Sequence, residues 1–172
     1  MRTSRKTKRR KTRERALKKT QAAKVTNINH SAYNDAYLSQ ILKEVQSIAL
    51  VGASNKTERP SNEVLRYLLN AGYKVFPINP GLAGQEIAGQ KVFATLGDVD
   101  HQIDMVDIFR KSDAVFSIVE EAIKISPKPK VIWMQLGVED KEAAKLAEAN
   151  GMRVVMNRCP KIEYGRLKHE LA

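Results

Sequence analysis

The segment from Ser47 to Asn62 constrains the fold of this chain most strongly, because an apolar run is followed at once by a turn of small residues and a helix start. Residues 47–51 read Ser-Ile-Ala-Leu-Val, which is typical of a buried strand, and Gly52-Ala53-Ser54 follows directly. We expect this turn to present free backbone N–H groups beside the N-terminus of a helix that begins near Pro60. Such an arrangement suits an anionic phosphate group.

The end of the next expected strand argues against the common NAD site. The dinucleotide fingerprint needs three glycines in the turn and an acidic residue about 20 residues later, which holds the ribose hydroxyls. Here the strand at 74–78 ends in Asn79-Pro80, without a carboxylate. A neutral strand end accommodates a ligand that carries phosphate on its ribose, because no carboxylate repels that charge. The pattern favours a phosphate-bearing ligand other than NAD, and a plain βα turn without any ligand stays open as the alternative.

Strand-like and helix-like segments alternate along the rest of the chain, which predicts an α/β fold with a doubly wound, mainly parallel sheet and helices on both faces. Apolar spacing predicts four helices, which begin near residues 35, 60, 113 and 139. The expected strands are 47–51, 74–78, 104–109, 131–134 and 152–156, with a short strand or an extended connection at 91–94.

In a sheet of this type, ligands bind outside the carboxyl ends of the strands, where the chain direction reverses. The residues expected at those ends are mostly small, amide or cationic, and they fall at 52–54, 79–80, 110–111, 135–137 and 157–160. Arg110 can place its guanidinium fork on a phosphate. The collection suits an elongated phosphorylated ligand better than it suits a catalytic site.

The net charge of +11 is confined to one end of the chain. Residues 1–24 contain 12 Lys or Arg residues against one acid, whereas the residues after 24 contain 18 basic and 18 acidic ones. We expect residues 1–30 to form a disordered basic tail and linker, and residues 31–172 to form the folded domain. Residues 2–24 have three interpretations: contact with nucleic acid, a localisation or transit signal, or an extension without function.

Composition also limits where the protein works. Cys159 is the only cysteine, which excludes an internal disulfide framework and a zinc site built from cysteines. No apolar run is long enough to cross a bilayer. We therefore expect a cytoplasmic protein with no membrane contact and no metal site, and the sequence leaves its oligomeric state open.

Five segments, taken in order, resemble the CoA-binding protein family of stand-alone Rossmann-like domains, which is related to the CoA-binding domain at the start of succinyl-CoA synthetase alpha chains. The likeness spans about residues 35–167. It rests on Val51–Ser54 with Arg59-Pro60-Ser61, and on Gly72–Pro80, Asp104–Arg110, Val131–Val138 and Asn157–Glu163.

The resemblance implies a Rossmann-like domain that binds coenzyme A or a short acyl-CoA. It implies that Gly52-Ala53-Ser54 lies at the pyrophosphate, that Asn79 and Pro80 lie near the adenosine, and that Arg110 is available to a phosphate. The other strand ends would frame the path of the pantetheine arm. The candidate ligand-binding residues are therefore Gly52, Ala53, Ser54, Arg59, Pro60, Ser61, Asn79, Pro80, Arg110, Gln135, Gly137 and Asn157.

For each residue that could act in catalysis, the sequence favours a structural role. Cys159 has no histidine placed to activate it, so a structural thiol is favoured over a nucleophile. Asp104 and Asp107 lie three apart on one strand and should point to opposite faces, which favours structural roles. Trp133 is expected in the core, and Glu163 is expected to pair with Arg158.

No catalytic constellation emerges, and the ligase activity of succinyl-CoA synthetase is not carried over, because its phosphorylated histidine and nucleotide-binding partner have no counterpart in this sequence. The leading hypothesis is a CoA-binding protein without catalysis of its own. The alternatives are an NAD(P)-binding redox protein and a nucleic-acid-associated protein that acts through its basic tail.

Overall fold

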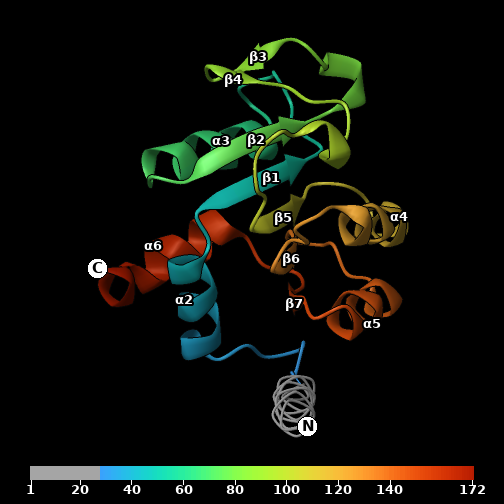
Figure 1. Cartoon of the computed structure of the whole chain (residues 1–172). Coiled ribbons are helices and arrows are strands. Elements are labelled where there is room, and N and C mark those ends of the chain that lie inside the picture. The colour runs from blue at the N-terminus through green and yellow to red at the C-terminus, as the bar shows by residue number, and fades with distance from the viewer. Residues whose placement is uncertain (1–27) are drawn as a thin grey trace, which may run out of the picture.

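A five-stranded sheet forms the centre of the molecule in the computed structural model, which describes residues 28–172 (Figure 1). The expected basic tail, apart from its last three residues, lies outside the described residues. The strands run in the order β2-β1-β5-β6-β7, and every neighbouring pair is parallel. Their bounds are β1 Ser47–Val51, β2 Lys74–Ile78, β5 Met105–Ile108, β6 Val131–Met134 and β7 Arg153–Val155. The predicted parallel sheet is confirmed.

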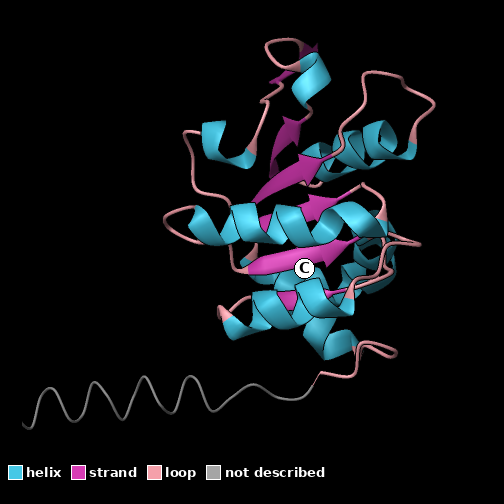
Figure 2. Cartoon of the chain, turned by 90° about the vertical axis from the view of Figure 1, so that its right-hand side faces the viewer, coloured by secondary structure: helices cyan, strands magenta, loops and turns pink. Residues whose placement is uncertain are grey.

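Helices cover both faces of this sheet, as Figure 2 shows from the side. Leu50 and Trp133 face a core formed with α2 (Asp35–Glu44), α3 (Pro60–Asn70) and α6 (Pro160–Leu171). Ala49 and Ile132, on the opposite side of the same strands, face a second core formed with α4 (Ser112–Lys124) and α5 (Lys141–Ala149). Strands buried on both faces read as continuous apolar runs, which is the pattern of β1 and β6.

The chain reverses its direction of travel across the sheet between β1 and β5. After β1 it crosses to β2 at one edge, and it then returns to β5 on the other side of β1. The connections that leave the carboxyl ends of β1 and β5 therefore diverge to opposite faces, and the space between them is the natural place for a ligand.

The connection between β2 and β5 is mostly irregular. It contains two short helical turns, η1 (Pro80–Leu82) and η2 (Leu96–Asp98), and a small hairpin of β3 (Glu86–Ile87) and β4 (Gln90–Lys91). Phe93 forms an isolated parallel bridge with Ile78. The segment 91–94 is predicted as a short strand or an extended connection. It contains Lys91, the last residue of β4, and then an extended connection that includes Phe93.

The helix starts follow local capping rules. Asn34 caps α2, with its side chain accepting a hydrogen bond from the backbone N–H of Tyr37 at 2.8 Å, and Asp140 caps α5 in the same way. None of the described helices is both long and apolar enough to cross a bilayer. The sequence pattern does not predict α6. Polar side chains occur on every side of this helix, and only Pro160, Glu163 and Leu167 are buried.

Candidate functional site

Gly52 brings the ends of β1 and β5 together. Its φ is +88°, and a Cβ built on it would lie 2.5 Å from the carbonyl oxygen of Phe109, so no other residue fits without a shift of the backbone. Its backbone N–H and that of Ala53 both donate to the carbonyl oxygen of Ile78, at 3.0 and 3.2 Å. The expectation of free N–H groups at these two residues is therefore wrong, because the end of β2 has already taken both donors.

Two buried or half-buried amide side chains hold the rest of this turn. Asn79 donates from Nδ2 to the carbonyl oxygen of Ala53 at 2.8 Å and accepts from the N–H of Gly81 at 2.9 Å. Asn62, which is 1% exposed, donates from Nδ2 to the carbonyl oxygen of Ser54 at 2.8 Å. Both amides thus shape the turn, and the structure records no described acceptor for the backbone N–H of Ser54.

A polar hollow of about 500 Å³ opens beside this turn. It is lined by small residues of the turn, by the start of α3, and by three cations, namely Gly52, Ala53, Ser54, Lys56, Arg59, Pro60, Ser61, Asn79, Phe109 and Arg110. No carboxylate from residues 28–172 lines it. Among residues 28–172, no acid forms an ion pair with Lys56, Arg59 or Arg110. Cations beside a helix N-terminus favour the binding of an anion.

A smaller hollow of about 250 Å³ adjoins the polar hollow at the end of β2. Gly52, Asn79 and Arg110 line both hollows, and Pro80 lines only the smaller one. On its far side, Glu121 of α4 accepts the backbone N–H of Leu96 at 2.7 Å. This adjoining hollow is where the sequence placed the nucleoside end of the ligand.

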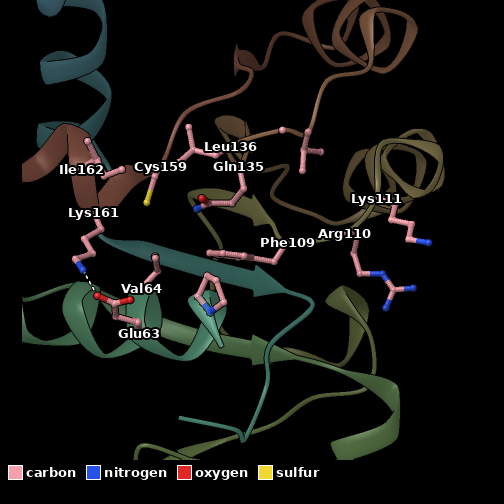
Figure 3. A pocket seen from close by; sticks show the side chains of 13 residues that line it. Glu63, Val64, Phe109, Arg110, Lys111, Gln135, Leu136, Cys159, Lys161 and Ile162 are labelled. Carbon is pink, nitrogen blue, oxygen red and sulfur yellow. Dashed lines mark hydrogen bonds and ion pairs between the residues drawn. The ribbon is translucent and has the colours of Figure 1, made fainter. Parts of the chain in front are cut away.

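An apolar cavity of about 610 Å³ adjoins the polar hollow on its other side (Figure 3). Pro60, Phe109 and Arg110 line both spaces. The remaining wall is mostly apolar and comes from α3, from the loops that follow β5 and β6, and from the start of α6. It consists of Glu63, Val64, Lys111, Gln135, Leu136, Gly137, Val138, Cys159, Lys161 and Ile162.

Gln135 is fixed by a buried carboxyl behind it. Its Nε2 donates to both carboxyl oxygens of Asp107, at 2.9 and 3.1 Å. Asp107 lies on β5 between Leu50 and Trp133 and is 0% exposed. Burial raises the pKa of Asp107 to about 8, while the hydrogen bond from Gln135 opposes that shift.

The other residues weighed for catalysis have structural contacts. Cys159 is 6% exposed, and burial raises the pKa of its thiol, which disfavours the nucleophilic thiolate. Trp133 is fully buried in the core, as predicted. Glu163 lies 3.7 Å from Arg158 Nε, which confirms that pair. Asp104 accepts the backbone N–H of Gln46 at 2.9 Å and pairs with Lys130, so its role is also structural.

The structure gathers eleven of the twelve candidate residues around these three hollows. The polar hollow takes Gly52, Ala53, Ser54, Arg59, Pro60, Ser61, Asn79 and Arg110, the adjoining hollow takes Pro80, and the apolar cavity takes Gln135 and Gly137. Asn157 lines none of the three. Its Oδ1 instead accepts the N–H of Gly137 at 2.8 Å, which supports the cavity wall from behind.

Sequence reasoning missed several residues of the cavity wall. Phe109 and Leu136 lie at the carboxyl ends of two predicted strands. Their apolar side chains, at strand ends that are otherwise polar, could have indicated an apolar part of the site. Lys161 and Ile162 belong to the unpredicted α6. Within residues 28–172, no cluster of three or more His, Cys, Asp or Glu residues could hold a metal ion.

Known proteins share the sequence pattern and the fold of this chain. The chain is 32% identical over 133 residues to the uncharacterized protein YneT of Bacillus subtilis (strain 168), a match that covers 77% of this chain and 96% of YneT. A solved hypothetical protein from Pyrococcus horikoshii OT3 is 39% identical, with a TM-score of 0.74, over 80% of this chain and 94% of that one.

A larger enzyme contains a similar domain. The dinucleotide-forming acetyl-coenzyme A synthetase 1 of Ca. Korarchaeum cryptofilum, solved in complex with phosphate and ADP, is 29% identical with a TM-score of 0.55, over 63% of this chain and 25% of that enzyme. A family model described as a CoA binding domain matches residues 46–165. Because this model covers more than half of a chain whose centre is a Rossmann-like parallel sheet, the chain belongs to the CoA-binding domain family.

Proposed function

We propose that this protein binds coenzyme A, or a short acyl-CoA, across the three hollows at the carboxyl edge of the sheet, without a reaction of its own. The observation that carries the proposal is the polar hollow, in which the described residues provide three cations without an ion-pair partner and no carboxylate. The pyrophosphate of CoA occupies this hollow, close to Ser54 and Arg110. Charge-assisted hydrogen bonds from Arg and Lys to phosphate are among the stronger polar interactions in proteins.

The other two hollows fit the two ends of the same ligand. The adenosine lies beside Asn79 and Pro80, and the pantetheine arm extends past Phe109 into the apolar cavity. At about 610 Å³, that cavity falls within the range of about 300–1,000 Å³ that is common for small-molecule sites. The absence of catalysis is supported by the raised pKa of the Cys159 thiol, which lies in the cavity wall.

Calorimetric titration with CoA, dephospho-CoA, NAD and NADP tests this proposal. CoA is expected to bind more tightly than dephospho-CoA, because the guanidinium of Arg110 lines the hollow beside Asn79 and Pro80 and can donate to the ribose phosphate. It is also expected to bind far more tightly than either nicotinamide dinucleotide, because β2 ends without the acidic residue that holds the ribose of NAD. Tighter binding of NAD than of CoA would contradict the proposal and would favour the redox alternative.

A second, separate function is favoured by the charge of the N-terminal segment, whose structure lies outside the described residues. Residues 1–24 carry a net charge of +11, and we propose that residues 2–24 contact nucleic acid in a cytoplasmic protein. Retention on heparin or RNA should fall steeply with salt in the full chain and vanish when residues 2–24 are deleted. Retention that survives the deletion would contradict this second proposal.

A further inference from the structure

The described surface exposes three large hydrophobic side chains, and two of them meet at the apolar cavity. Leu136 is 57% exposed and Ile162 is 53% exposed, and both line the cavity, whereas Phe116 lies elsewhere on α4. Exposed apolar side chains that gather at one opening mark a binding surface. The mouth of this cavity therefore favours an apolar group.

The position of these residues fixes which part of a ligand they meet. Arg110 lines the cavity at the end that it shares with the polar hollow, and Ile162 belongs to α6 at the other end (Figure 3). A ligand whose phosphates lie at Arg110 therefore directs its far end toward Leu136 and Ile162. In CoA the far end is the sulfur, and in an acyl-CoA it is the acyl chain.

Gln135 sets the register of that ligand. It is only 5% exposed, and its Nε2 is committed to Asp107. No described residue donates to its Oε1, and among residues 28–172 no fully buried polar side-chain atom lacks a partner, so Oε1 must be reached from the cavity. An acceptor here fits an amide N–H of the pantetheine arm and offers nothing to a thioester carbonyl, so an amide bound at Gln135 would leave the acyl group beyond it.

We propose that the part of the apolar cavity beyond Gln135, toward Leu136 and Ile162, is an acyl chamber, and that the protein binds aliphatic acyl-CoA more tightly than free CoA. This inference rests on the proposed CoA site and adds the class of its ligand. Glu63 of α3 and Lys161 of α6 form an ion pair in the cavity wall. An acyl chain that reaches this pair must desolvate it, which limits the length of chain that the chamber accepts.

Calorimetric titration of the full chain with CoA and with acetyl-, butyryl-, hexanoyl- and octanoyl-CoA tests the proposal. Each buried methylene is expected to tighten binding about threefold to fourfold, so hexanoyl-CoA should bind at least about tenfold more tightly than CoA before the gain stops. Equal affinities across the series would overturn the acyl chamber and leave the CoA site intact. No binding of any member would overturn the CoA site itself.

Three serine variants test whether the acyl chain binds in the chamber or to exposed apolar side chains in general. In Leu136→Ser and Ile162→Ser, the ratio of hexanoyl-CoA to CoA affinity should fall at least about threefold, because the chain loses apolar contact area. Phe116→Ser, an exposed position outside the cavity, serves as the matched control and should keep the ratio of the unmodified protein. An unchanged ratio in both cavity variants, or an equal fall in the control, would show that another surface holds the acyl chain and would overturn the proposal.

Discussion

The polar hollow and the apolar cavity share Pro60, Phe109 and Arg110 but are built in opposite ways. The polar hollow is formed by turns whose backbone groups are held by hydrogen bonds from Asn79 and Asn62. The apolar cavity is formed by side chains from helices and loops far apart in the sequence. Most of the polar hollow thus comes from residues 52–61, with Asn79, Phe109 and Arg110 added by two neighbouring strand ends, whereas the apolar cavity depends on packing between more distant elements.

This difference also separates the forces that act on the two ends of the ligand. Attraction of phosphates to the exposed cations of the polar hollow is screened by salt, with a Debye length of about 8 Å at physiological ionic strength. Burial of apolar surface in the cavity is nearly independent of salt. Substitutions in the two regions should therefore differ in kind as well as in size.

The largest effect is expected at Gly52, where the polar hollow depends on backbone contact. Gly52→Val should destabilise the fold by at least about 3 kcal/mol and abolish CoA binding, because a side chain there meets Phe109 and a positive φ is strained. Thermal unfolding and calorimetry measure both effects. Gly84→Ala is the control, since its φ of +85° is nearly the same but nothing lies within 4 Å of the added Cβ. Similar losses of stability in both variants would refute the contact argument.

Asp107, behind the apolar cavity, should give a large dependence of stability on pH. The folded protein holds this proton up to about pH 8, whereas an unfolded Asp releases it near pH 4. The unfolded state therefore binds fewer protons between these values, and the contribution of Asp107 to the free energy of unfolding falls as pH rises from about 4 to 8. Asp107→Asn should gain stability relative to the unmodified protein across that window, as melting temperatures at pH 5, 7 and 9 would show.

Asp104, which immediately precedes the same strand, provides the opposite control. Burial alone would raise its pKa, but the Lys130 side chain and the backbone N–H of Gln46 hold the pKa below its usual value. Its contribution to stability is therefore present above the unfolded pKa and is lost as pH falls. Asp104→Asn should be destabilised at neutral pH and should approach the unmodified protein in acid. The same pH trend in both variants would contradict these assignments.

Arg110 should show a smaller effect that is confined to binding. Arg110→Ala is expected to weaken CoA binding by about 1.5–3 kcal/mol through loss of a charge-assisted bond to phosphate, and to flatten the salt dependence of the affinity. Arg153→Ala, at the amino end of β7, is the control, because that guanidinium pairs with Glu44 away from the hollows. An unchanged affinity in Arg110→Ala would remove this residue from the site.

The smallest effect is expected at Asn157, which supports the cavity wall without lining it. Asn157 has a φ of +54°, so Asn157→Gly relieves backbone strain while it removes the hydrogen bond to Gly137. The affinity for CoA should change by less than about 1 kcal/mol, the worth of an ordinary hydrogen bond. A larger loss in calorimetry would indicate that Asn157 contacts the ligand directly.

Features that depend on local sequence could be predicted. The turn at Gly52, the cap at Asn34 and the strand ends that carry Asn79 and Arg110 follow from turn chemistry and apolar runs, and together they predict the parallel sheet and the edge at which the hollows lie. Membership of the CoA-binding domain family then favours CoA over NADP, a choice that residue patterns alone left open.

Features that depend on contacts between distant parts of the chain could not be predicted from the sequence. Nothing local shows that Ile78 takes the N–H groups of Gly52 and Ala53, because that contact requires β2 to end beside β1. The helix α6 lacks a continuous apolar stripe, so its contribution of Ile162 to the cavity was invisible. The raised pKa of Asp107 likewise follows only from complete burial between two neighbouring strands.

The most direct test of the central claim is a crystal structure of the protein with CoA. We expect one molecule of CoA to span both regions, with its pyrophosphate between Ser54 and Arg110 and its pantetheine arm along Phe109 toward Gln135. A pyrophosphate bound outside the polar hollow, or a pantetheine arm that leaves the apolar cavity empty, would contradict the division of the site into a charged end and an apolar end.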